Sequence, residues 1–133
     1  MSTATTVSPF LMFEGRAEEA MNFYVSLFDD GKVLEILRYG AGEPGKEGSV
    51  KRANFSISGL TVICIDSPIK HGFTFTPAIL LFVTCSSDDQ IERLSAALSD
   101  SGSILMPLSN YGFSRKFAWV SDRFGVAWQL NLE

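Results

Sequence analysis

The chain has 133 residues and a mass of 14.6 kDa, which is the size of one domain, and 46% of its residues are hydrophobic. Its formal net charge is -4 and its 11 Lys and Arg are scattered, which argues against nucleic acid as a partner. No apolar run approaches the ~20 residues of a membrane span, and residues 1–6 lack the features of a secretory signal. We therefore expect a cytoplasmic protein with no membrane partner.

Aromatic residues are abundant in so short a chain, with 11 Phe, 3 Tyr and 2 Trp. They are compatible with a pocket that has aromatic walls and, equally, with a Phe-rich core. The two cysteines, Cys64 and Cys85, each lie in an apolar run typical of a strand. Both are predicted to be reduced and buried, without a disulfide.

The first half of the chain predicts the order strand, helix and three strands. Residues 7–13 form an apolar run, and apolar residues then recur at helical spacing over 17–28. Residues 33–39 are rich in branched side chains, and residues 53–57 and 60–65 form a hairpin with a tight turn between them.

The second half repeats this order after a link rich in Pro and Gly. Residues 78–85 predict a strand, and a helix follows whose first turn carries Ser87 and Gln90 at capping-box spacing. Residues 104–108, 116–120 and 126–132 predict three more strands.

The repeated order indicates an internal duplication. The predicted fold class is α+β, with two βαβββ modules that form curled mixed sheets around a cupped cleft and carry their helices outside. Module one covers about residues 5–66 and module two about residues 77–133, within a single domain spanning 1–133. The cleft is a common place for a small-molecule ligand.

The C-terminal run over residues 115–130, which contains Asp-Arg-Phe-Gly-Val-Ala-Trp-Gln at 122–129, resembles the ending of PhnB-like proteins. Further matches lie at residues 20–24, 59–67 and 73–78. PhnB-like proteins belong to the glyoxalase, bleomycin-resistance and extradiol-dioxygenase superfamily, also called vicinal oxygen chelate, and are often labelled 3-demethylubiquinone methyltransferase-like. The resemblance implies the paired βαβββ fold and a homodimer.

Two activities implied by the resemblance find little support in the residues. Methyl transfer from S-adenosylmethionine normally needs a Gly-rich turn between a parallel strand and a helix, and residues 40–45 carry Pro44 with no helix behind them. Metal-dependent members of the superfamily ligate an ion from the first and last strands of each half. Those places fall near Pro9, Cys64, Ala78 and Gln129, which are poor ligands for a divalent ion.

The candidate ligand-binding residues are Gln129 and five residues whose side chains are expected to line the cleft. If Trp128 faces the helix, Gln129 faces the cleft, because successive strand residues point to opposite sides. The loop at residues 111–113 has aromatic residues around a flexible Gly, which suits closure over a ligand or an ordinary connection. The five others are Phe10, Phe55, Cys64, Trp119 and Tyr111.

Other polar residues have both a structural and a functional interpretation. His71, the single His, is either a loop residue or a proton donor at the mouth of the cleft. Glu35 and Asp66 either face solvent and brace turns or act as a base. Asp122 is predicted to hold the turn over residues 121–125 through backbone amides.

The sequence thus predicts a metal-free small-molecule-binding protein that uses no cofactor, with unknown catalytic residues and an unknown ligand. Two enzymatic alternatives stay open. One is a lyase or isomerase that uses a divalent ion bound by Gln129, Cys64 or carboxylates, and the other is a methyltransferase.

Overall fold

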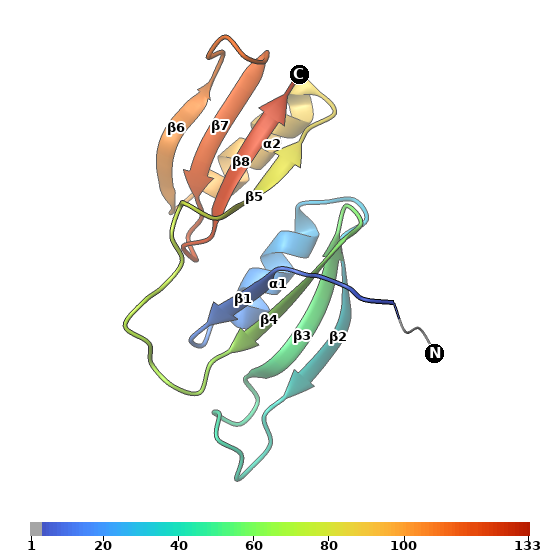
Figure 1. The fold of residues 1–133 in the computed structure, drawn as a ribbon, viewed down its shortest axis with the longest axis vertical. Helices are drawn as coiled ribbons and strands as arrows, with labels where there is room; N and C mark the ends of the chain where they lie inside the picture. The colour runs from blue at the N-terminus through green and yellow to red at the C-terminus, as the bar shows by residue number, and fades with distance from the viewer. Residues whose placement is uncertain (1–3) are drawn as a thin grey trace. The chain divides into compact units, whose positions relative to one another are not determined.

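The structure, a computed structural model, describes residues 4–133. The chain divides into two compact units, of which the first ends at His71 and the second spans Gly72–Glu133. Each unit has the order β-α-β-β-β and contains one four-stranded mixed sheet (Figure 1). The predicted α+β class and the duplication are therefore confirmed.

The first unit contains β1 (Phe10–Phe13), α1 (Ala17–Ser26), β2 (Lys32–Arg38), β3 (Val50–Ile57) and β4 (Leu60–Asp66). Its strands lie in the order β1-β4-β3-β2, with β1 parallel to β4 and the other neighbours antiparallel. The hairpin between β3 and β4 turns as predicted.

The second unit contains β5 (Leu80–Thr84), α2 (Asp88–Ser99), β6 (Ser103–Ser109), β7 (Lys116–Ser121) and β8 (Ala127–Leu132). The strand order β5-β8-β7-β6 matches that of the first sheet, and β5 is again parallel to β8. Neither helix within residues 4–133 is long and apolar enough to cross a membrane.

One side of each sheet is packed against the helix of its own unit. In the first unit, the ring of Phe55 lies 6.1 Å from the ring of Tyr24 on α1. In the second, Lys116 reaches Asp88 and Glu92 on α2, so residues that share its side of the sheet face the helix. We call the side of each sheet away from its helix the open face. The residues of the open face follow from the alternation of side chains along every strand.

Two tight turns depend on unusual backbone conformations. Ser58 and Gly59 join β3 to β4 with φ angles of 47° and 85°, the pair of positive values that a two-residue hairpin requires. Gly125, with a φ of 92°, closes the turn before β8. In that turn Asp122 accepts hydrogen bonds from the amides of Phe124 and Val126, as predicted.

The two helices are capped by different means. In α2, the amide of Gln90 donates to Ser87 Oγ, as predicted, but the Gln90 side chain accepts from Ser86 instead of completing the box on Ser87. The start of α1 has no cap from its own N-cap residue, Arg16. Its capping group comes from far along the chain.

Asp66, the last residue of β4, supplies that group. Its Oδ1 accepts from the amides of Gly15 and Ala17 at 2.8 and 2.9 Å, and its Oδ2 accepts from the amide of Val50 at 3.1 Å. The side chain is buried, so these bonds replace water around the carboxylate. The negative charge also lies at the positive end of α1. Asp66 therefore joins β4 to the first turn of α1 and to the start of β3.

Replacing Asp66 by Ala should lower the free energy of unfolding by about 3 kcal/mol, because three backbone amides lose their acceptor and two of the lost hydrogen bonds are buried. Urea denaturation followed by circular dichroism measures the change. Asp30→Ala is the matched control, since Asp30 accepts one exposed bond from the Ser58 amide. Equal losses in the two variants would contradict the role assigned to Asp66.

Candidate functional site

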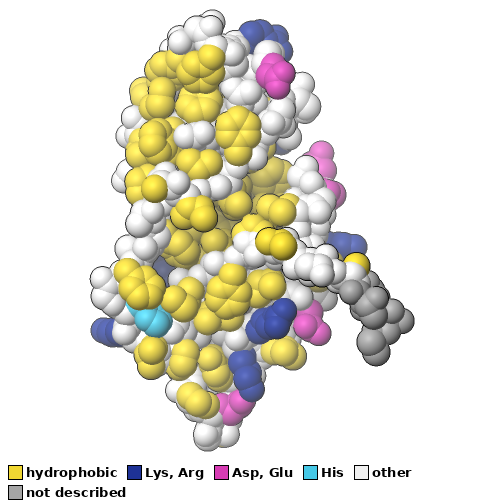
Figure 2. Space-filling view, viewed as in Figure 1, with side chains coloured by type: hydrophobic (Ala, Val, Ile, Leu, Met, Phe, Trp, Pro, Cys, Tyr) yellow, Lys and Arg dark blue, Asp and Glu magenta, His cyan; other side chains and the backbone are white. Residues whose placement is uncertain are grey.

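A row of four side chains crosses the open face of the second sheet. Phe82 on β5 lies opposite Gln129 on β8, Gln129 lies opposite Trp119 on β7, and Trp119 lies opposite Met106 on β6. Directly opposite residues of neighbouring strands share one side of the sheet. We call these four residues the cross-strand row. In the view of Figure 2, hydrophobic side chains gather over the strands of this unit.

Gln129 lies on the open face because its neighbours in sequence are packed against α2. Trp128 and Leu130 are fully buried, and Leu132 is opposite Lys116, which reaches α2. Gln129 is only partly buried and lies between Phe82 and Trp119. An amide that can donate and accept thus occupies the centre of an aromatic surface.

An aromatic cluster extends this surface toward one end of β7. The rings of Tyr111 and Phe113 stack at 6.2 Å, and both meet the ring of Phe117 edge to face, at 6.2 and 5.0 Å. Phe117 is two residues before Trp119 and lies opposite Asn131, so it belongs to the open face. The Tyr111 hydroxyl donates to the carbonyl of Pro107 at 2.5 Å, which fixes the ring.

The two tryptophans differ in how their indole N–H groups are satisfied. Trp128 Nε1 donates to Asp122 Oδ2 at 2.9 Å in a buried, charge-assisted bond. Trp119 Nε1 is buried, yet no acceptor among the described protein atoms receives its hydrogen. Buried polar groups are nearly always hydrogen-bonded, so a buried donor without a protein acceptor needs a physical reason.

The first sheet carries a comparable row on its own open face. Phe10 on β1 lies opposite Ile63 on β4, Ile63 lies opposite Asn54 on β3, and Asn54 lies opposite Glu35 on β2. The Oδ1 atom of Asn54 is buried without a protein donor. The third strand of each row thus contributes one buried polar atom that the protein leaves unpaired.

Two of the residues predicted to line the cleft lie on the side of the first sheet that packs against α1. Phe55 and Cys64 are 0% exposed and face α1, where Phe55 packs on Tyr24. Burial raises the pKa of the Cys64 thiol to about 12, so the thiol stays neutral near pH 7. Neither side chain reaches the open face, because the apolar residues of β3 and β4 pack under the helix. Phe10, Trp119, Tyr111 and Gln129 do belong to open faces or to the loop beside one.

Asp66, His71 and Glu35, the polar residues with both a structural and a functional interpretation, differ in their contacts. Asp66 is a capping group whose oxygens already accept three backbone bonds. His71 Nε2 lies 2.8 Å from Ser67 Oγ, and the His71 amide donates to Glu14. Glu35 is exposed on β2. These contacts support the structural interpretation of Asp66.

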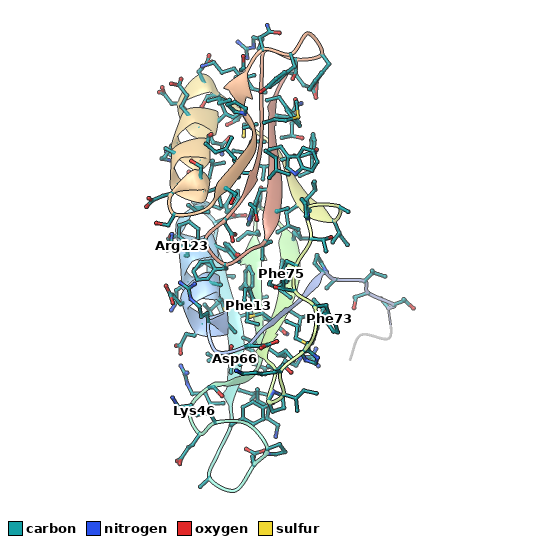
Figure 3. All side chains as sticks on the ribbon, turned by 90° about the vertical axis from the view of Figure 1, so that its left-hand side faces the viewer. Phe13, Lys46, Asp66, Phe73, Phe75 and Arg123 are labelled. Atoms are coloured by element: carbon teal, nitrogen blue, oxygen red, sulfur yellow. The ribbon has the colours of Figure 1, made fainter. Side chains whose placement is uncertain are left out.

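A separate pocket of about 550 Å³ lies in the first unit, between the start of α1, residues 45–50 and residues 66–68. Figure 3 labels Asp66 and Lys46 at this end of the unit. Three of its carboxylates already have partners, because Glu18 pairs with Arg38, Glu14 accepts from His71, and Asp66 caps α1. Its carboxylates are thus largely engaged in structural contacts.

Comparison with known proteins places the chain in a family. The family described as 3-demethylubiquinone-9 3-methyltransferase matches residues 5–131, nearly the whole chain. The chain belongs to this family. No curated protein sequence matches it.

Solved structures extend the comparison of this PhnB-like chain. A PhnB protein from Bacillus cereus, with a title that also names 3-demethylubiquinone-9 3-methyltransferase, is 51% identical, with a TM-score of 0.94 over 97% of this chain and 100% of that one. Protein PA1353 from Pseudomonas aeruginosa is 27% identical, with a TM-score of 0.86 over 98% of both chains. The fosfomycin resistance protein FosX from Listeria monocytogenes, 13% identical with a TM-score of 0.62 over 99% of this chain and 95% of that one, shares the fold.

The superfamily's metal positions can be tested against these side chains. Of the four predicted places, Pro9 and Ala78 offer no side-chain ligand, and the Cys64 thiol is turned toward α1. The open-face neighbours are Ile63 in the first sheet and Gln129 in the second. Within residues 4–133, no three His, Cys, Asp or Glu side chains lie close enough to hold an ion. A neutral amide among apolar groups does not fit the donor set of a divalent ion.

Replacing Trp128 by Phe should lower the free energy of unfolding by about 2 kcal/mol more than replacing Trp119 by Phe does. Both changes remove the same atoms, but only the first breaks a buried, charge-assisted hydrogen bond, the one that Trp128 donates to Asp122 Oδ2. Urea denaturation of the two variants gives the difference. Equal losses would mean that the Trp119 indole N–H has an acceptor of similar strength.

Proposed function

We propose that this PhnB-like protein is a metal-free binding protein of the glyoxalase-like superfamily. It holds a small, partly apolar molecule against the open face of its second sheet, and Gln129 supplies a polar contact. The cross-strand row is the observation that carries this proposal, because it combines one amide with the aromatic rings of Phe82 and Trp119. Ligand sites are typically apolar surfaces with a few placed polar groups.

The aromatic cluster supports the same function. Phe113 is 63% exposed and Tyr111 is 38% exposed, although both rings are held by contacts with Phe117. Rigid rings with an exposed side offer contact area at a small entropy cost. In the proposed function, this loop covers one end of the bound molecule.

The proposed working form is a cytoplasmic homodimer. Large apolar side chains are exposed on the edge strands β2 and β6, among them Leu34, Leu37 and Ile104. Exposed apolar groups on edge strands favour association with another chain. A second copy would cover them.

The two enzymatic alternatives need chemistry that the side chains do not favour. A metal-dependent lyase or isomerase needs several ligands for a divalent ion. At the described positions the second sheet offers the side chain of Gln129, and the neighbours of Gln129 are apolar. A methyltransferase, the activity in the family's description, needs a site for S-adenosylmethionine. The loop at residues 40–48 connects two antiparallel strands and is closed by its own backbone hydrogen bonds, so it does not lead from a parallel strand into a helix as a nucleotide-binding turn does.

Titration with a metal or with S-adenosylmethionine separates these alternatives. We expect no rise in melting temperature with nickel, zinc or manganese, because the protein lacks a set of side-chain ligands for a divalent ion. We expect no heat of binding with S-adenosylmethionine, because the protein lacks the Gly-rich turn that such a site normally needs. Elemental analysis of protein purified without chelator is the control for carried-over metal. Stoichiometric metal with thermal stabilisation would replace the proposed function by the lyase or isomerase, and saturable heat with S-adenosylmethionine would favour the methyltransferase.

Replacing Gln129 by Leu should weaken binding of neutral, naphthalene-sized aromatic fragments that carry a hydrogen-bonding group about fivefold and leave the fold intact, because one neutral hydrogen bond is lost. Proton–nitrogen correlation spectra of isotope-labelled protein give the affinities and show whether the cross-strand row is perturbed. Ser103→Ala, at the exposed start of β6, is the control. Fragments that leave the row unperturbed, or that bind the Leu variant equally well, would contradict the proposed site.

A further inference from the structure

We infer that Trp119 determines ligand specificity, by donating its indole N–H to an acceptor atom of an uncharged aromatic ligand. The inference rests on the proposed function, because it concerns the same face of the second sheet. It adds the chemical class of the ligand and the residue that selects it.

The first step is the unpaired donor. Trp119 Nε1 is buried without a protein acceptor, whereas the chemically identical Nε1 of Trp128 has one. An indole nitrogen can only donate, so the missing partner must be an acceptor. Gln129, which lies opposite Trp119, does not supply it, although its side chain carries a carbonyl oxygen.

The second step concerns charge. Lys116 is the only charged residue in the four strands of the second sheet, and it is turned toward α2, where it pairs with Asp88 and Glu92. The strands therefore direct no charged side chain to the open face. A carboxylate or phosphate held there would lose its water without gaining a counter-charge. The acceptor must belong to an uncharged group, such as a carbonyl.

The third step concerns shape. The residues beside Trp119 and Gln129 in the row are Phe82 and Met106, and Phe117 lies on the same strand and side as Trp119. Aromatic rings and a thioether favour a flat aromatic molecule. Because Nε1 has no exposed surface, a side chain must move when the acceptor approaches. Met106, unbranched and opposite Trp119, is the most flexible candidate.

Three probes of matched size test the inference: methyl naphthyl ketone, isopropylnaphthalene and naphthoate. The ketone carries an uncharged acceptor, the hydrocarbon has none, and naphthoate is anionic. The chain has two Trp residues, so its spectrum contains two indole N–H signals, which Trp119→Phe assigns. The Trp128 signal, fixed by Asp122, then reports that the variant is folded.

We expect the ketone to bind about tenfold more tightly than the hydrocarbon and to shift the Trp119 indole signal while the Trp128 signal stays in place. In Trp119→Phe, the ketone and the hydrocarbon should bind equally. Naphthoate should bind more weakly than the ketone to the wild-type protein.

Two outcomes separate the inference from the function beneath it. If the ketone and the hydrocarbon both perturb the cross-strand row with equal affinity, or the Trp119 signal does not move, the face binds ligands but Trp119 does not select them. That result overturns the inference alone. If neither neutral probe perturbs the row, the proposed function fails and the inference fails with it.

Discussion

Each half of this protein depends on one constraint, which is that a four-stranded sheet has two sides and its own helix can cover only one. The helix buries every second residue of the central strands, as in the series Trp128, Leu130 and Leu132. The residues between them are forced to the other side, because side chains alternate along a strand. The composition of the open face is therefore a by-product of packing the core. Asp66 fixes this geometry in the first half by tying the start of α1 to the end of β4.

The parts of the molecule that could be predicted are those encoded by residues close together in sequence. Three such features connect residues at most four apart. They are the positive-φ turn at Ser58 and Gly59, the hydrogen bonds that Asp122 accepts from backbone amides, and the Ser87 cap. The side of Gln129 also followed from the burial of its neighbour Trp128. Phe55 and Cys64 were misplaced although the same rule applied to them. They belong to the apolar set of an alternating strand, and that set packs under the helix.

The features that could not be predicted depend on register between strands or on contacts distant in sequence. The sequence does not show that the Asp66 carboxylate meets the amides of Gly15 and Ala17, because those residues are separated by 51 and 49 positions. Whether Trp119 meets Met106 depends on register shifts in β6, which periodicity does not encode. The unpaired state of Trp119 Nε1 is harder still, since it depends on where every nearby acceptor points.

The duplication gives these unpaired atoms a common origin. Asn54 and Trp119 occupy the third strand of equivalent rows, and each leaves one buried polar atom without a protein partner, an acceptor in the first sheet and a donor in the second. A polar atom left this way costs about 1–3 kcal/mol of stability. If packing alone mattered, an apolar side chain at either place would remove that cost. In the second sheet, the proposed ligand offsets this cost by supplying the missing acceptor. The apolar surroundings of Trp119 require that ligand to be recognised by hydrogen bonds rather than by charge or by coordination to an ion.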